Sequence, residues 1–143
     1  GFGYAAFSAA MAAGRFVGDR LRSRFGAAAI VRAGAALAVV GILAGPATGS
    51  VAGAIAGFAL AGLGLSNVVP VLISAAGAGP RGDVAIATVT TLGYGGLLAA
   101  PPLLGFVADA TSLATMFTVV AGMCAAVLVG GGIAKAGRVG PAS

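Results

Sequence analysis

Histidine, tryptophan and glutamate are absent from this sequence of 143 residues, which holds only three aspartates and one cysteine. Without histidine, imidazole catalysis and histidine-ligated metal sites are excluded. Cys124 has no partner for an internal disulfide, and the three aspartates are scattered along the chain instead of clustered as metal ligands. We therefore expect neither a metal nor a cofactor.

Charge of either sign is also scarce, because charged residues make up 8% of the chain. Soluble domains carry roughly 25%, and so few charges could hardly cover a water-exposed surface. Hydrophobic residues reach 59% and the mean hydropathy is +1.10, which predicts a chain whose solvent is the lipid bilayer. The net charge of +5 does not indicate nucleic-acid binding, since the basic residues lie between apolar runs and form no aromatic-interleaved face.

Five apolar runs are long enough to cross a bilayer as helices, which takes about 20 residues each. The alternation that a membrane β-barrel requires is missing, so we expect an all-α integral membrane bundle. The predicted spans are about 1–18, 27–45, 51–76, 84–107 and 112–134, followed by a polar tail at 135–143. The first run lacks an initiating Met and a preceding basic segment, so we expect earlier helices to be missing.

The basic residues predict which face of the membrane each connection occupies. With five spans, all eight Lys and Arg residues fall on one face, and the connections "GPATGS" and "ADATS" contain neither. Cytoplasmic loops carry such an excess, which predicts a cytoplasmic carboxyl terminus and an outside amino end. The eight residues are Arg15, Arg20, Arg22, Arg24, Arg32, Arg81, Lys135 and Arg138.

Polar side chains inside apolar runs predict a cavity, because burying such groups in lipid is costly. They are concentrated in the first, third and fourth spans. The residues that we expect to line a substrate cavity are Tyr4, Ser8, Asn67, Thr91 and Tyr94. The Ser and Thr hydroxyls have an alternative, which is to bond back to carbonyls of their own helix. The Asn67 amide needs up to four partners, which backbone bonding rarely supplies.

Glycine and proline positions predict how the helices pack and bend. Small residues recur at spacing four, which lets helix backbones approach closely in lipid. The pairs are Gly14/Gly18, Gly41/Gly45 and Gly53/Gly57. Pro46 and Pro80 are expected between spans, whereas Pro70, Pro101 and Pro102 are expected to kink the third and fourth helices. Asp83 and Ser112 are the expected N-caps of the fourth and fifth helices.

The stretch "GRFVGDRLRSRFG" (14–26) resembles the conserved cytoplasmic loop of major facilitator superfamily transporters. "GLGLSNVVPVLISAAG" (62–77) resembles their tenth helix, and "GYGGLLAAPPLLGFVADATSLATMF" (93–117) the eleventh with the entry to the twelfth. The resemblance, strongest to bacterial sugar permeases of the fucose type, implies helices eight to twelve of a twelve-helix fold. The glycine spacing of 14–26 departs from the common loop pattern, as in a degenerate second-half copy.

The resemblance also implies a role for the loop, which is to lock the cytoplasmic side in one conformation. Asp19 would bond to the amino end of a neighbouring helix or to an arginine, for which Arg81 is the candidate. The alternative is a solvated basic loop, which we favour for Arg22 and Arg24. The residues assigned to this latch and loop motif are Gly14, Arg15, Gly18, Asp19, Arg20, Arg24, Gly26 and Arg81.

The predicted function is secondary transport of a small, sugar-like or drug-like solute by alternating access. The expected partners are the lipid bilayer, the solute and the missing amino-terminal helices, with no nucleic acid. One alternative is a structural or assembly subunit of a membrane complex that does not transport. The other is a membrane-embedded lipid-modifying enzyme, which would need clustered acids or a histidine, and the three aspartates are isolated from one another.

Overall fold

The fold is entirely helical, as expected, in the part of the chain that the structure describes. This computed structural model describes the backbone of residues 1–136 and the side chains of residues 1–130 apart from Asp19. Of the predicted tail, 137–143 lies outside the described residues, and 135–136 continue the last helix. The helices are α1 (Phe2–Phe25), α2 (Ala27–Ala47), α3 (Val51–Leu65), α4 (Val68–Gly77), α5 (Gly82–Ala110) and α6 (Leu113–Ala136).

Four segments of the described chain are long and apolar enough to cross a membrane. They are Ala27–Ala47, Val51–Gly77, Gly82–Ala110 and Leu113–Gly130, and they follow the order of the second to fifth predicted spans. The segment Val51–Gly77 contains both α3 and α4. α1 is not among the four, because arginines and Asp19 interrupt the apolar character of its carboxyl-terminal half. A membrane crossing by the first run therefore stays a prediction.

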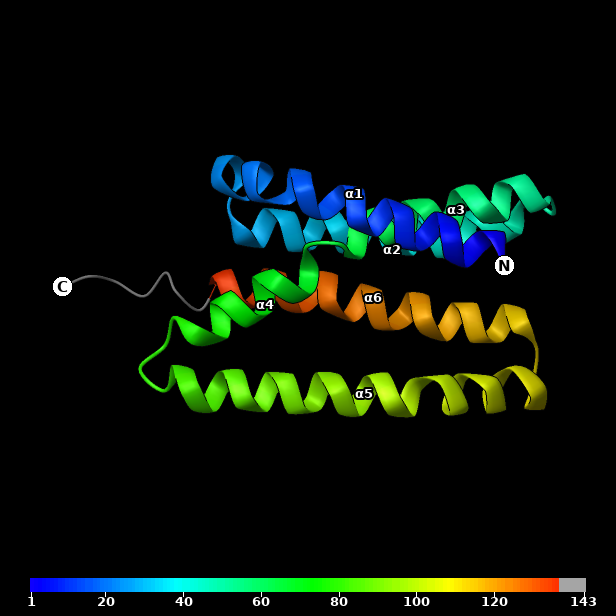
Figure 1. The fold of residues 1–143 in the computed structure, drawn as a ribbon. Helices are drawn as coiled ribbons and strands as arrows, with labels where there is room; N and C mark the ends of the chain where they lie inside the picture. Colours follow the sequence, from blue (N-terminus) through cyan, green and yellow to red (C-terminus); the bar gives the residue numbers. More distant parts are fainter. Residues whose placement is uncertain (137–143) are drawn as a thin grey trace.

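The helices form one layer of α1, α2 and α3 and a second of α4 and α6, with α5 packed on the outer side of α4 and α6 (Figure 1). Successive spans run in opposite directions. The α1–α2 and α4–α5 connections lie at one end of the bundle, and the α2–α3 and α5–α6 connections lie at the other (Figure 1). Arg22, Arg24 and Arg81 consequently lie toward the same end, as the alternation of five spans predicts.

Glycines allow α2 and α3 to pack with their backbones in contact. A Cβ added to Gly45 would lie 2.8 Å from the Gly57 Cα, and one added to Gly64 would lie 3.0 Å from the Ala38 backbone nitrogen. A Cβ on Gly41 would collide with the Gly57 carbonyl oxygen. The predicted pair Gly41/Gly45 thus meets Gly57 across the interface, where close approach maximises dispersion contacts between helices in lipid.

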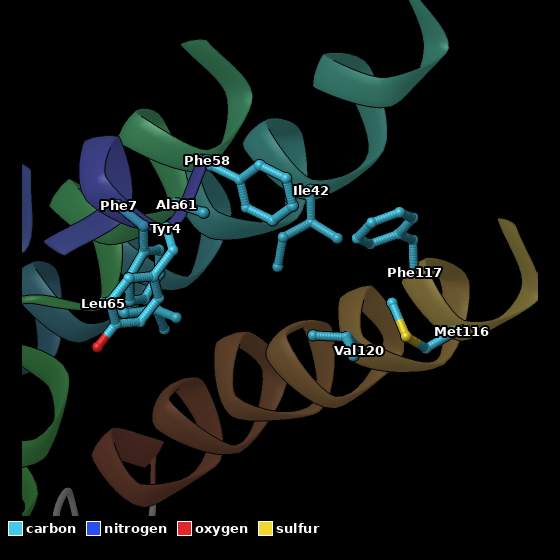
Figure 2. Close-up of a pocket in the computed structure, with 9 residues that line it drawn as sticks. All are labelled: Tyr4, Phe7, Ile42, Phe58, Ala61, Leu65, Met116, Phe117 and Val120. Carbon is cyan, nitrogen blue, oxygen red and sulfur yellow. The ribbon is translucent and has the colours of Figure 1, made fainter. Parts of the chain in front are cut away.

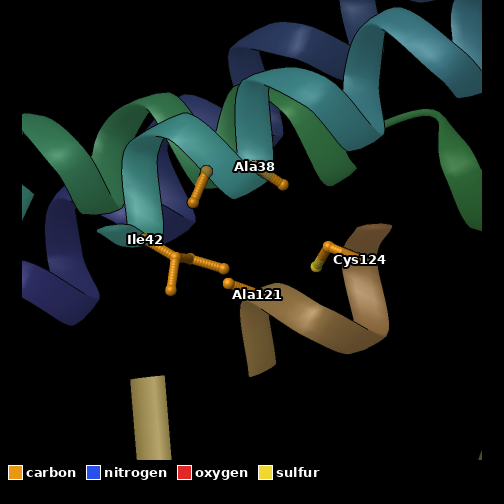
Figure 3. Close-up of a cluster of buried hydrophobic side chains, with 5 residues drawn as sticks. Ala38, Ile42, Ala121 and Cys124 are labelled. Carbon is orange, nitrogen blue, oxygen red and sulfur yellow. The ribbon is translucent and has the colours of Figure 1, made fainter. Parts of the chain in front are cut away.

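Small side chains also make up the core that joins the two layers. Ala38 and Ile42 of α2 face Ala121 and Cys124 of α6, as Figure 3 shows, and Ala61 of α3 completes this cluster. A second cluster joins α2 to α4 through Val31, Val68 and Val71. α2 therefore lies at the centre of the bundle, in contact with α3, α4 and α6.

The third span is broken near its middle, between α3 and α4. Ser66 and Asn67 form a turn, after which α4 begins at Val68 in the other layer (Figure 1). Pro70 was expected to bend a continuous helix, but it lies in the first turn of α4, after the break. A helix tolerates proline there because the backbone N–H groups of the first turn have no partner within the helix.

Two other local expectations were wrong, and one is confirmed. Pro46 lies inside the last turn of α2 instead of between spans. Arg81 is the N-cap of α5, so Asp83 lies in the first turn, where the helix dipole still favours a carboxylate. Ser112 does cap α6, since its Oγ accepts the Thr115 N–H at 3.1 Å. α5 continues as one helix through Pro101 and Pro102, and a kink at these residues stays a prediction.

We predict that Gly57→Ala destabilises the bundle by about 1–3 kcal/mol, the usual effect of adding a methyl group where there is no room. The matched control is Gly122→Ala in α6, where a Cβ meets nothing within 4 Å and the higher helix propensity of alanine favours the variant. Thermal unfolding of the purified protein in detergent measures both effects. Equal midpoints for the two variants would contradict the α2–α3 contact.

Candidate functional site

Thr91 and Tyr94 lie about one turn apart on α5, a helix with no buried residue in this bundle. A spacing of three places both side chains on the same side of the helix, and Tyr94 is 65% exposed. Thr88, one turn earlier, donates from its Oγ1 to the Val84 carbonyl at 2.8 Å, as the back-bonding alternative expects. Among the described contacts, Thr91 makes no such bond, so its hydroxyl is available to a ligand.

Tyr4 lines a pocket of ≈ 440 Å³ between α1, α2, α3 and α6 (Figure 2). The rings of Phe58 and Phe117 meet there edge to face, with centroids 5.9 Å apart. The full lining is Tyr4, Phe7, Ile42, Phe58, Ala61, Leu65, Met116, Phe117 and Val120. Apart from the Tyr4 hydroxyl the lining is apolar, so the pocket suits a hydrophobic or aromatic group. Ser8 is exposed and is not part of this lining.

Asn67 lies at the break between α3 and α4, against α1. Its Nδ2 donates to the Gly14 carbonyl oxygen at 2.9 Å and to the Ser66 Oγ at 2.9 Å. A second pocket, of ≈ 250 Å³, is formed there by α1, α2 and α3, and its lining includes Gly14, Gly18, Ser66 and Asn67. The amide therefore has hydrogen-bond partners that could not be identified from the sequence. They lie at a contact between helices.

The structure does not bring the five expected cavity residues together in one pocket. Tyr4 lines the larger pocket and Asn67 the smaller one. Thr91 and Tyr94 line neither of the two, and Ser8 is exposed on α1. The assignment of these five residues to one substrate cavity therefore stays a prediction.

The glycines of the 14–26 motif have structural roles, and the close packing at Gly14 and Gly18 agrees with the spacing of this pair. Gly14 and Gly18 are buried where α1 packs against Ser66 and Asn67. A Cβ on Gly14 would lie 2.8 Å from the Ser66 Cβ, and one on Gly18 would collide with the Asn67 amide. Gly26 alone connects α1 to α2, with φ 81° and ψ 159°, a conformation that is essentially restricted to glycine.

The arginines of the motif make few contacts among the described residues. The Arg15 guanidinium lies 3.8 Å from the Met11 sulfur, and that of Arg24 lies 5.6 Å from the centroid of the adjacent Phe25 ring. Arg20 and Arg81 are exposed. Because the side chain of Asp19 lies outside the described residues, its proposed bond with Arg81 stays a prediction.

Arg22 makes a contact that sequence reasoning missed. Its Nη1 donates to the Ser74 Oγ at 3.2 Å, which joins the carboxyl-terminal end of α1 to α4. We expected Arg22 to be solvated. Nothing in the sequence identified Ser74 as its partner, because a serine in an apolar helix commonly bonds to its own backbone. The basic end of the bundle therefore contains a polar link between two helices in different layers.

Comparison with known proteins shows similarity over most of the chain. It is 42% identical over 123 residues to an uncharacterized MFS-type transporter of Yersinia pestis, covering 85% of this chain and 32% of that protein. It is 38% identical over 128 residues to membrane protein MosC of Rhizobium meliloti, covering 87% and 31% respectively. It is 36% identical over 130 residues to uncharacterized transporter y4wD of Sinorhizobium fredii, covering 89% and 34% respectively.

The chain spans about a third of the length of these curated relatives. The similarity supports a relationship to MFS-type transporters and agrees with a helical chain that crosses a membrane several times. No protein-family model matches the chain, and no solved structure matches it.

We predict that Gly26→Ala destabilises the protein by about 1–3 kcal/mol, because alanine is strained at this φ and ψ. Gly79→Ala is the matched control in the other connection at this end. Gly79 is not among the glycines with positive φ, and the nearest atom to its added Cβ is the Ala76 carbonyl oxygen at 3.9 Å. Chemical denaturation in mixed micelles measures the free energy of unfolding of both variants. A larger loss of stability for Gly79→Ala than for Gly26→Ala would contradict the strain expected for alanine at position 26.

Proposed function

Because the chain is similar over most of its length to transporters of the MFS type, we propose that it is part of a secondary transporter. The transporter moves a small solute across a membrane by alternating access, and this chain supplies a portion of its carboxyl-terminal half. The observation that carries the proposal is α5, a helix long and apolar enough to cross a membrane, with no buried residue in this bundle. Its Thr91 and Tyr94 are exposed.

We assign the position of the chain in the transporter from the resemblance of residues 14–26 to the second-half copy of the loop, together with the order of the helices. α1, α2, the broken span α3–α4, α5 and α6 follow the order of helices eight to twelve of a major facilitator fold. The arginines of the described connections lie toward one end of the bundle (Figure 1), which the positive-inside bias places in the cytoplasm. The start of α1 then lies outside, and the membrane is the inner membrane of a bacterium.

The chemistry of the proposed solute is inferred from two features of the chain, the hydroxyls on α5 and an apolar pocket. Thr91 and Tyr94 provide hydroxyls that can exchange hydrogen bonds with the hydroxyl groups of a sugar. The pocket between α1, α2, α3 and α6, which Thr91 and Tyr94 do not line, has a volume of ≈ 440 Å³ and an aromatic and aliphatic lining, which suits the apolar face of a sugar or a drug-like molecule. A sugar-like solute accords best with both, and with the resemblance to fucose-type permeases.

Enzymatic activity is not part of the proposal, because the described acidic groups are far apart. Asp83 lies in the first turn of α5 and Asp109 in its last turn. At a rise of about 1.5 Å per residue they are separated by roughly 40 Å. Paired carboxylates for acid–base or metal-assisted chemistry on a lipid head group need to lie within a few ångströms of a common substrate.

We predict that Thr91→Val in the full-length protein lowers the uptake of a bound sugar roughly 2- to 10-fold, the effect of one lost hydrogen bond. Thr88→Val is the matched control, because the Thr88 hydroxyl is already bonded to the Val84 carbonyl. Uptake of radiolabelled L-fucose into proteoliposomes, with ethidium efflux from cells as a second assay, measures the effect. If the full-length protein moves neither probe but turns over a lipid, the proposal is wrong.

A further inference from the structure

The sequence around the break in the third span leaves the Asn67 side chain free to contact another helix. Asn67 is the N-cap of α4, where an asparagine normally accepts a backbone N–H from the first helical turn. In "NVVP" the third residue of α4 is Pro70, which has no N–H to donate, so only the Val69 N–H could donate to a cap. Asn67 makes no side-chain cap bond to α4, and its amide instead points toward α1.

The amide is held by a short chain of hydrogen bonds. Asn67 Nδ2 donates to the Gly14 carbonyl oxygen of α1 at 2.9 Å and to the Ser66 Oγ at 2.9 Å. The Ser66 hydroxyl donates in turn to the Leu63 carbonyl oxygen at 2.6 Å, near the end of α3. Ser66 is 1% exposed. One polar cluster therefore joins α1, the end of α3 and the start of α4.

Two glycines of α1 make room for this cluster. Gly14 and Gly18 lie one turn apart, and each is buried against the break. A side chain at Gly18 would displace the Asn67 amide, and one at Gly14 would displace Ser66. The small-residue pair and the amide are therefore complementary parts of one contact between α1 and the break.

α4 has few other attachments to the layer that contains α1. It lies in the second layer, with α5 on its outer side (Figure 1), and its Val68 and Val71 pack on Val31 of α2. Beyond the Asn67 contact, the polar link from α1 to α4 is the exposed bond from Arg22 to Ser74. The amide is thus the inner of two polar contacts that hold α4 near α1.

We propose that Asn67 is an interhelical clamp, and that the turn at Ser66–Asn67 is a hinge about which α4 moves away from α1 when the clamp opens. A single amide–carbonyl hydrogen bond in a membrane bundle is weak enough to break and re-form. The Ser66 N–H donates to the Leu63 carbonyl and the Asn67 carbonyl accepts the Val71 N–H, and among the described residues no backbone hydrogen bond joins α3 to α4 across the turn. The inference concerns this bundle, and it holds whether or not the full-length protein transports a solute.

The test measures the distance between α1 and α4 in the full-length protein by double electron–electron resonance. Spin labels are attached at Ser23→Cys and Ala75→Cys, both exposed positions at the basic end of the bundle. Asn67→Asp keeps the shape of the side chain but removes both donor hydrogens. We expect it to convert a narrow distance distribution into a broader one with a second population at longer distance.

Two further variants separate clamp opening from general damage. Gly18→Ala retains the Asn67 donors but pushes the amide away from α1, so it should produce the same long-distance population. Gly122→Ala, which adds a methyl group in open space, should leave the distribution unchanged. A label pair at Ala5→Cys and Ala52→Cys reports on α1 and α3 remote from the break and should change in none of the variants.

The proposal is overturned if Asn67→Asp and Gly18→Ala both retain the narrow Ser23–Ala75 distribution. It is also overturned if the Ala5–Ala52 distribution broadens as much as the Ser23–Ala75 distribution, since that result indicates general loosening and no hinge at Asn67. Should Asn67→Asp fail to fold, Gly18→Ala and Asn67→Leu supply the same comparison. The measurement does not depend on transport, so failure of the proposed function leaves its outcome unaffected.

Discussion

Contact between helix backbones is the interaction on which this bundle depends. In lipid, apolar side chains gain little by leaving the solvent for a neighbouring helix, so dispersion at close range and interhelical hydrogen bonds must stabilise the assembly. Gly41, Gly45 and Gly57 bring α2 and α3 together, and small residues of α2 extend the contact to α6. With α2 in place at the centre, the positions of α1, α4 and α6 follow from what packs on it and on α3.

The parts of the fold that could be predicted from sequence are those governed by single, strong constraints. Unpaired backbone groups are so costly in hydrocarbon that long apolar runs had to be helices. The alternation of five spans was sufficient to place Arg22 and Arg81 toward one end of the bundle. The N-cap at Ser112 could also be predicted, because it depends on a single hydrogen bond between one hydroxyl and one N–H.

The parts that could not be predicted depend on which helices meet. Asn67 was recognisable as a buried amide in need of partners, but Gly14 lies 53 residues away along the chain, and nothing local to either residue identifies the other. The break before Pro70, instead of a bend at it, likewise depends on α4 packing against α2. The five residues assigned to a cavity do not share a pocket here, since polar character alone does not say which face of each helix is turned toward the others.

The single-residue connection at Gly26 has a mechanical consequence. A joint of one residue has only two backbone torsions, so the φ and ψ of Gly26 set the angle between α1 and α2. α4 and α5, by contrast, are joined by residues 78–81, and α4 is separated from α3 by an unwound turn. The chain therefore joins α1 to α2 at one defined angle, whereas α4 has non-helical residues on both sides, 66–67 before it and 78–81 after it, so a change in the direction of α4 can be absorbed by its own connections.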